Sequence, residues 1–197
     1  MKFLKENFSE ALRIYINQIG ISIFYFALIF PLNEISGEGG LSPVWDFLVS
    51  LFTICFFYVL VYYAVWEVGA KDKIRIDSGR YEPTPAKGAL LGLVGNIPNL
   101  IFSLPLLAFA AVRLFNDVLN NAFGIFNTVT RFHEVYYAGA LRLFFDLNSG
   151  DTGVQFLIAL FFVLLPLCSI GVTSFAYYMG SHEKRILYFI PQKPNKK

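Results

Sequence analysis

Charged residues are scarce in this chain, and so are the residue types that most often build catalytic and metal sites. Only 15% of its 197 residues are Asp, Glu, Lys or Arg, and it has two cysteines and two histidines. Soluble domains carry about 25% charged residues. The deficit argues against a soluble globular domain. The net charge of +2 gives no support for nucleic-acid binding.

Recognisable catalytic motifs are missing as well. The sequence has no CxxC, no HExxH or HxxEH pattern, and neither of the phosphate-binding patterns GxxxxGK[ST] and GxGxxG. Cys55 and Cys168 fall in apolar stretches, where thiols usually behave as small hydrophobes. For His133 and Glu134 a solvated helix face is the favoured interpretation, with a small outer polar cluster as the alternative. We therefore expect no enzyme, no cofactor and no metal site.

Long apolar stretches dominate instead. Hydrophobic residues make up 56% of the chain, with 22 Phe and 11 Tyr. The hydrocarbon core of a bilayer is about 30 Å thick, so roughly 20 apolar residues in a helix cross it. The sequence predicts an all-α fold, a polytopic four-transmembrane-helix bundle forming one integral membrane domain over residues 1–197. Its spans are expected near residues 11–33, 43–70, 86–112 and 153–180.

Charge is distributed unequally among the connections. Residues 33–42 contain two acids and no Lys or Arg, whereas residues 71–87 contain five basic residues and residues 181–197 another five. Because short basic loops stay in the cytoplasm, we expect a protein of the cell membrane with both termini cytoplasmic. Basic residues beside a span attract anionic lipid headgroups. The expected headgroup contacts are Lys71, Lys73, Arg75, Arg80, Lys87, Lys184 and Arg185.

Residues 113–152 are too polar for a span and too apolar for a free loop. Their apolar positions suit two short amphipathic helices, one at Leu114, Val118 and Leu119 and another around Phe132. An amphipathic segment lying at the outer interface, between the third and fourth spans, is the favoured interpretation. A re-entrant hairpin is the alternative, because irregular backbone is tolerated at membrane depth where protein covers it.

Small and polar residues recur along one face of the third span, and a shorter stripe follows the fourth. Such residues allow close approach of helices and hydrogen bonds between them. We expect these two helices to pack tightly, with a kink from the prolines of the third span. A wall of a polar cavity is the alternative role. The residues concerned are Gly88, Gly92, Gly95, Asn96, Asn99 and Ser103 in the third span and Ser169 and Thr173 in the fourth.

The sequence places no carboxylate in the middle of a span, since Asp46 and Glu67 lie at the ends of the second. That weakens any proton- or cation-coupled mechanism. The favoured hypothesis is a non-catalytic accessory, assembly or regulatory subunit that acts through helix packing and partner contacts. A small transporter or channel protomer with a polar path along the third span is the alternative, and an intramembrane enzyme ranks last. The expected partners are the lipid bilayer and another membrane protein or further copies of this chain.

Overall fold

The computed structural model describes residues 2–37, 41–82, 84, 86–116, 119–184 and 186, with side chains from Asn7 onward. Its regular structure is helical, and no strand occurs in these ranges. In chain order the elements are α1 (Lys2–Ser36), α2 (Pro43–Asp77), α3 (Lys87–Gly95), α4 (Ile97–Arg113), α5 (Asn120–His133), the 3-10 turn η3 (Val135–Tyr137), α6 (Ala138–Leu141) and α7 (Thr152–Ser181).

Three of these helices are long and apolar enough to cross a membrane. They are Asn7–Ser36 within α1, Pro43–Asp77 and Thr152–Ser181. The pair α3–α4 gives a fourth candidate only if its two helices, bent by 62°, form one span. The all-helical class is therefore confirmed. In place of four comparable spans, the described chain has three long helices, one broken pair and further short helices.

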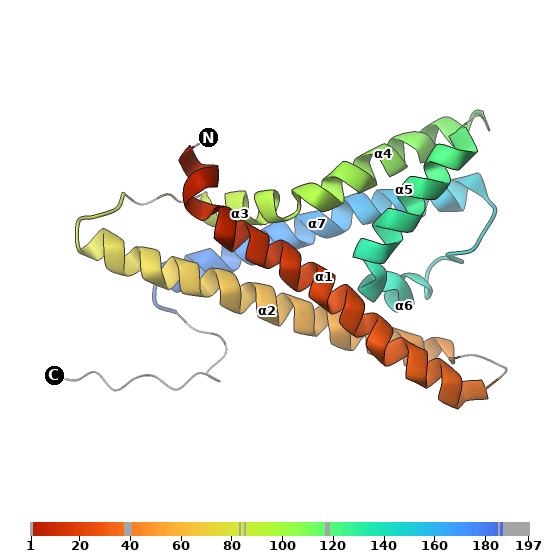
Figure 1. The fold of residues 1–197 in the computed structure, drawn as a ribbon, viewed down its shortest axis with the longest axis horizontal. Coiled ribbons are helices and arrows are strands. Elements are labelled where there is room, and N and C mark those ends of the chain that lie inside the picture. The colour runs from red at the N-terminus through yellow and green to blue at the C-terminus, as the bar shows by residue number, and fades with distance from the viewer. Residues whose placement is uncertain are drawn as a thin grey trace.

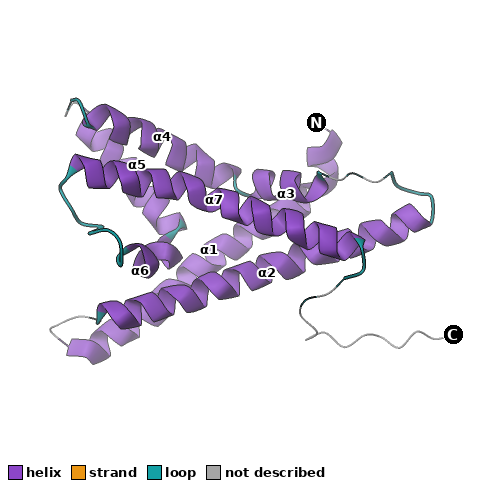
Figure 2. Cartoon of the chain, turned by 180° about the vertical axis from the view of Figure 1, so that it is seen from behind, coloured by secondary structure: helices purple, strands orange, loops and turns teal. Residues whose placement is uncertain are grey.

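The helices α3 and α4 follow one another beside α7, and α5 runs from the end of α4 back toward α6 (Figure 1). Helix α7 packs against α2 on one side and against α3 and α4 on another, as the reverse view shows (Figure 2). Glycines permit the closest approach of α2 and α7: a Cβ on Gly69 would lie 2.5 Å from the carbonyl oxygen of Tyr177. The end of the molecule where α2 ends, α3 begins and α7 ends is called the basic end below, because Lys71, Lys73 and Arg75 lie there.

The break in the third apolar stretch falls at Asn96. Pro98 follows in the first turn of α4 and has no N–H with which to continue the hydrogen-bond ladder of α3. Asn96 Nδ2 donates to the carbonyl of Gly92 at 2.7 Å, which also accepts from the backbone N–H of Asn96 at 3.1 Å, and to Ser169 Oγ at 3.2 Å. The kink expected from the prolines is confirmed, and the amide of Asn96 links the end of α3 to α7.

The chain between α4 and α7 turns back into the bundle. Helix α5 returns along α4, and η3 and α6 then pack against α2 (Figure 1). The second predicted amphipathic helix, around Phe132, forms only in part: α5 ends at His133, and the chain continues as η3 and α6 where one helix was expected. The first does not form as predicted: α4 ends at Arg113, Leu114 is in a turn, α5 begins at Asn120, and Val118 lies outside the described residues.

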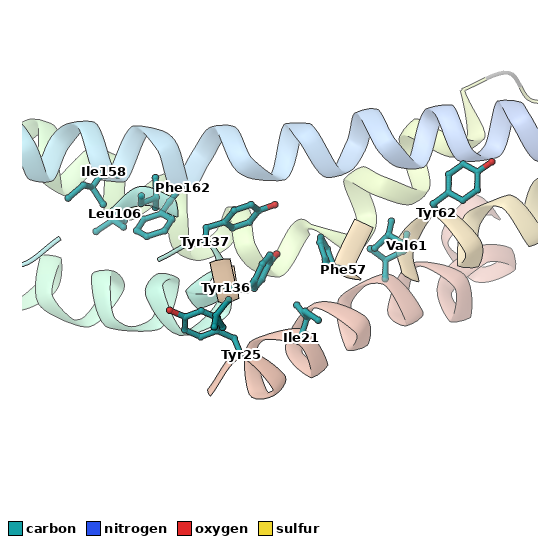
Figure 3. Packing of buried hydrophobic residues seen from close by; sticks show 14 of the residues in the cluster. Ile21, Tyr25, Phe57, Val61, Tyr62, Leu106, Tyr136, Tyr137, Ile158 and Phe162 are labelled. Atoms are coloured by element: carbon teal, nitrogen blue, oxygen red, sulfur yellow. The ribbon is translucent and has the colours of Figure 1, made fainter. Parts of the chain in front are cut away.

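Aromatic side chains from η3 form the centre of the buried core. Tyr136 and Tyr137 point between the long helices, among Ile21, Phe57 and Phe162 (Figure 3). The Tyr136 ring lies 5.2 Å from that of Phe57, centroid to centroid. The short turn therefore contributes to the same core as α1, α2 and α7, and is not laid over the end of the bundle.

Candidate functional site

The junction between α5 and α6 holds polar side chains that were predicted to lie outside the bundle and that the structure places inside it. His133 ends α5, Glu134 follows, and Tyr136 belongs to η3. Glu134 and Tyr136 are each 1% exposed, and His133 is 9% exposed. The interpretation of His133 and Glu134 as a solvated helix face is therefore wrong, because packing against the other helices removes both from solvent.

Serines from α1 and α2 hold this junction by its backbone. Ser22 Oγ donates to the carbonyl of His133 at 2.7 Å. Ser50 Oγ donates to the carbonyl of Tyr136 and accepts a hydrogen bond from the N–H of Ala140 at 3.2 Å. Buried carbonyls and N–H groups outside regular helices need such partners. The two serines thus fix the irregular backbone on either side of Glu134.

Glu134 itself has no such partner. Both of its carboxyl oxygens are buried and receive no hydrogen bond from any described residue. A carboxyl that is removed from water and receives no hydrogen bond is costly in its ionised form. Its surroundings therefore favour the protonated, neutral acid over the carboxylate.

Three tyrosines lie within electrostatic range of the Glu134 carboxyl: Tyr58, Tyr136 and Tyr137. The hydroxyl oxygens of Tyr58 and Tyr137 are 2.6 Å apart, and Gln18 Nε2 donates to the Tyr136 hydroxyl at 3.3 Å. A phenol can both donate and accept a hydrogen bond. Such a hydroxyl stays neutral when it passes one proton on and accepts another.

Other side chains, from α1, α4 and α5, also hold buried polar atoms that have no hydrogen-bond partner within the described ranges. These atoms are Gln18 Oε1, both amide atoms of Asn99, and the hydroxyls of Ser103 and Thr130. Together with Glu134 we call these side chains the buried polar layer. Its members are Gln18, Asn99, Ser103, Thr130 and Glu134.

A contact from α1 shows how deep the junction around Glu134 lies. Gln18 is in the half of the span Asn7–Ser36 nearer to Asn7, roughly 16 Å from that end and 27 Å from the other at about 1.5 Å per residue. Ser22, whose Oγ donates to the carbonyl of His133, is close to the midpoint of this span. The backbone next to Glu134 therefore lies roughly 20 Å from either end of it, at about 1.5 Å per residue.

A buried carboxylate lies toward each end of α2. At the start of the helix, Asp46 is 2% exposed, accepts a hydrogen bond from the Tyr25 hydroxyl at 2.7 Å and pairs with Arg142. A Cβ on Gly139 would overlap the backbone carbonyl of Asp46, so α6 touches α2 here. This Asp46 cluster fastens the segment after Glu134 to α2.

The corresponding group at the basic end is built on Asp72. It is 1% exposed, lies 2.7 Å from Lys87 Nζ, and accepts a hydrogen bond from the Tyr177 hydroxyl at 3.0 Å. Arg75 adds a longer contact of 3.7 Å. This Asp72 cluster fastens the start of α3 to α2 and α7.

The predicted contact between the two stripes of small residues is confirmed at its centre. A Cβ on Gly88 would lie 2.6 Å from Tyr177 Cβ, and one on Gly92 would overlap Thr173 Oγ1. Asn96 reaches Ser169 by the hydrogen bond described above. The seam between α3 and α7 is thus a packing contact with one polar link.

The remaining members of the two stripes lie elsewhere. Gly95 faces α1, where a Cβ would lie 2.9 Å from Ile14 Cβ. Asn99 and Ser103 are buried at 2% and 0% exposure, and both belong to the buried polar layer. The third-span face that was predicted to form one seam therefore packs partly against α7 and partly against α1.

The cations that were expected at lipid headgroups differ in how exposed the structure leaves them. Lys71, Arg75, Arg80 and Lys184 are exposed, and Lys73 is half-buried beside Asp77. Lys87 is 4% exposed and turned toward Asp72, so its ammonium is committed to the Asp72 cluster. Arg185 lies outside the described residues.

Sequence reasoning missed Glu134 as a candidate. Its neighbours Arg131, His133, Tyr136 and Tyr137 resemble the polar half of a surface helix. The useful signal lay just beyond them: the run Ala138, Gly139 and Ala140 supplies three small residues that permit close contact with another helix. Comparisons with protein-family models, with curated proteins and with solved structures found no match for this chain.

Proposed function

We propose that this chain is a small proton-carrying membrane transporter in which the carboxyl of Glu134 binds and releases the transported proton. The observation that carries the proposal is the unpartnered carboxyl of Glu134, buried near the middle of helices long enough to span a bilayer. Ionisable side chains are costly in that environment and usually mark a transport pathway or relay. If the Glu134 side chain only filled space in the bundle, an uncharged glutamine amide would serve as well.

The absence of space around the carboxyl favours a proton over a larger ligand. The two carboxyl oxygens of Glu134 and the two amide atoms of Asn99 are closed to water. A hydrated cation or an organic solute needs such space, whereas a proton does not. A proton path also needs no open pore. A single copy of the chain, with its three or four candidate spans, could therefore carry protons without assembling into an oligomer.

Two irregular features next to the layer support the same function. The α3–α4 pair is broken at Asn96, and the α5–α6 junction interrupts a second helix. In transporters, broken helices and irregular backbone at membrane depth are found where protein or a cavity covers them. We accordingly propose the re-entrant arrangement for residues 120–141, with the basic end in the cytoplasm as the charge distribution indicates.

The two clusters on α2 supply a means of access from each side. The Asp46 cluster lies toward the end of the molecule opposite the basic end, and the Asp72 cluster lies at the basic end. Opening either one would free a segment that covers the buried polar layer: the segment after α6 in the first case and α3 in the second. Alternate opening would expose Glu134 to one side at a time.

Proton flux into proteoliposomes tests this proposal. Purified protein is reconstituted with an enclosed pH-sensitive dye, and a potassium gradient with valinomycin sets a negative interior. We expect faster acidification than in empty liposomes, no such flux for Glu134→Gln, and a partial flux for Glu134→Asp. Glu82→Gln is the matched control, because Glu82 is exposed in a connection. Equal flux from the wild type and Glu134→Gln, or no flux above empty liposomes, would contradict the proposal.

The accessory or regulatory subunit favoured by the sequence is the competing proposal. Its support is the lack of any recognisable catalytic motif and the packing seam between α3 and α7. Purification in mild detergent separates the two. An accessory subunit co-purifies with a second membrane protein and its liposomes show no flux, whereas the transporter shows flux alone.

A further inference from the structure

A polar cleft opens at the basic end, away from the buried polar layer. The start of α1, the last turns of α2 and the start of α3 enclose it, and its volume is about 220 Å³. Pockets for drug-sized ligands are typically about 300–1,000 Å³. The cleft therefore suits a smaller polar group.

Basic side chains line most of the cleft opening. Arg13, Lys71 and Arg75 are each more than half exposed. Glu67 takes one nitrogen of Arg13 at 3.2 Å and the ammonium of Lys71 at 2.8 Å. A guanidinium has five N–H donors and an ammonium three, so these cations retain donors that point to solvent.

Carboxylates in the same cleft leave only a small positive excess. Its lining carries four cations and three acids, with the Asp72–Lys87 pair as a buried floor. Glu10 also lines it; its Oε2 is enclosed, so a ligand in the cleft reaches this carboxyl through the other oxygen, Oε1. A ligand that carries an anion and a cation a few bonds apart fits this lining better than a simple anion.

Apolar side chains stand beside the polar opening. On α1, Phe8 is 59% exposed and Leu12 is 40% exposed, each one position before a residue of the cleft. The cleft itself lies at the end of the helices that are long enough to span a membrane. A ligand with acyl chains would lay them along this apolar surface while its headgroup entered the cleft.

We propose that this cleft binds the headgroup of a phospholipid that carries a primary amine, as in phosphatidylethanolamine. Its phosphate lies among Arg13, Lys71 and Arg75, and its ammonium donates to Glu10. Arginine and lysine are the usual phosphate-binding side chains. The site is independent of the proton path proposed above, and neither proposal requires the other.

Lipid binding to the purified full-length chain tests this inference. Native mass spectrometry and thermal unfolding in detergent are recorded with phosphatidylethanolamine, phosphatidylcholine and phosphatidylglycerol, and with inorganic phosphate and phosphoethanolamine as soluble probes. We expect bound lipid and a raised midpoint with phosphatidylethanolamine, and less with phosphatidylcholine, whose quaternary ammonium cannot donate a hydrogen bond. Equal responses to all three lipids would overturn the amine assignment. A full response to either soluble probe would overturn the lipid source.

Paired variants separate the cleft from general surface charge. Lys71→Gln with Arg75→Gln removes two cations of the cleft and should weaken lipid binding by about ten- to thirtyfold, at about 1 kcal/mol per cation. Lys73→Gln with Arg80→Gln removes the same charges at the same end but outside the cleft, and should keep the preference for phosphatidylethanolamine over phosphatidylcholine with a smaller loss of binding. Glu10→Gln should abolish the preference for the amine lipid. Equal loss in both double variants would overturn the site.

Discussion

Lys87 Nζ lies 2.7 Å from Asp72 Oδ2, and both side chains are buried. This ion pair joins the first turn of α3 to the end of α2, where Tyr177 of α7 also donates to Asp72. The consecutive helices α2 and α3 and the last helix α7 therefore meet at one carboxylate. The pair holds the start of α3 against the other two helices.

Removing the cation should be costly. Breaking a buried ion pair by deleting one partner typically costs about 3–5 kcal/mol, because a charge is left buried and unpaired. We expect Lys87→Met to lower the midpoint of thermal unfolding in detergent, and Lys87→Met with Asp72→Asn to recover part of the loss. Lys73→Met should change nothing measurable, since its partner Asp77 is exposed. If the double variant is no more stable than Lys87→Met, the ion pair does not hold α3.

Adding a single methyl group at the contact between α3 and α7 should lower the stability of the protein. A Cβ at Gly92 would overlap Thr173 Oγ1 and lie 2.9 Å from the Cα of Ile170. Overpacking of this kind usually costs about 1–3 kcal/mol. We expect Gly92→Ala to lower the unfolding midpoint and Thr173→Ala to restore it in part. Gly171→Ala is the control, because nothing lies within 4 Å of a Cβ there. Equal unfolding midpoints for Gly92→Ala and Gly171→Ala would contradict the close contact between α3 and α7.

Hydrogen exchange should report how the segment around Glu134 is held. A methyl at Gly139 would overlap the carbonyl of Asp46, whereas one at Gly124 would meet no atom within 4 Å. We expect Gly139→Ala to speed amide exchange in peptides covering residues 133–142, because α6 is displaced from α2 and local opening becomes cheaper. Gly124→Ala should leave those peptides unchanged. Unaltered exchange in Gly139→Ala would show that α6 does not depend on this contact.

The stability of the protein should depend on pH through Glu134. Its carboxyl is buried without a hydrogen bond, so the folded state favours the protonated acid more strongly than the unfolded chain does. The bound proton therefore stabilises the folded state fully below the ordinary glutamate pKa of about 4.3, and this contribution is lost as pH rises above that value. Glu134→Gln should therefore be more stable than the wild type at pH 7, by about 1–3 kcal/mol.

Unfolding midpoints recorded between about pH 4 and about pH 8 measure this dependence, because the range begins near the ordinary glutamate pKa. The difference between Glu134→Gln and the wild type should shrink toward pH 4. Glu82→Gln should follow the wild type throughout. A constant difference across that range would mean that the Glu134 carboxyl does not change its protonation on unfolding.

Features repeated along the chain were predictable from the sequence. The apolar stretches correspond to the long helices and to the broken pair, since length and hydrophobicity suffice to identify them. The contact of Gly92 with Thr173 was predictable because small residues at helical spacing mark close approach. Asn96 and the prolines likewise indicated a bend in the third stretch.

Features that depend on how segments fold against one another were not predictable. The charge distribution assigned Lys87 to the membrane surface, because counting cations does not reveal that Asp72 lies within reach of it. Glu134 sits in a segment too short to span, so hydropathy gave no measure of its depth. Only the packing of η3 and α6 between α1 and α2 buries it.

Infrared spectroscopy of the reconstituted protein tests most directly whether Glu134 is a buried neutral acid that exchanges its proton. The difference spectrum between the wild type and Glu134→Gln at neutral pH isolates this one carboxyl. We predict a carbonyl-stretch band of a protonated acid that shifts when H₂O is replaced by D₂O. A carboxylate band in its place, or a protonated band that never exchanges with D₂O, would contradict a proton-carrying Glu134.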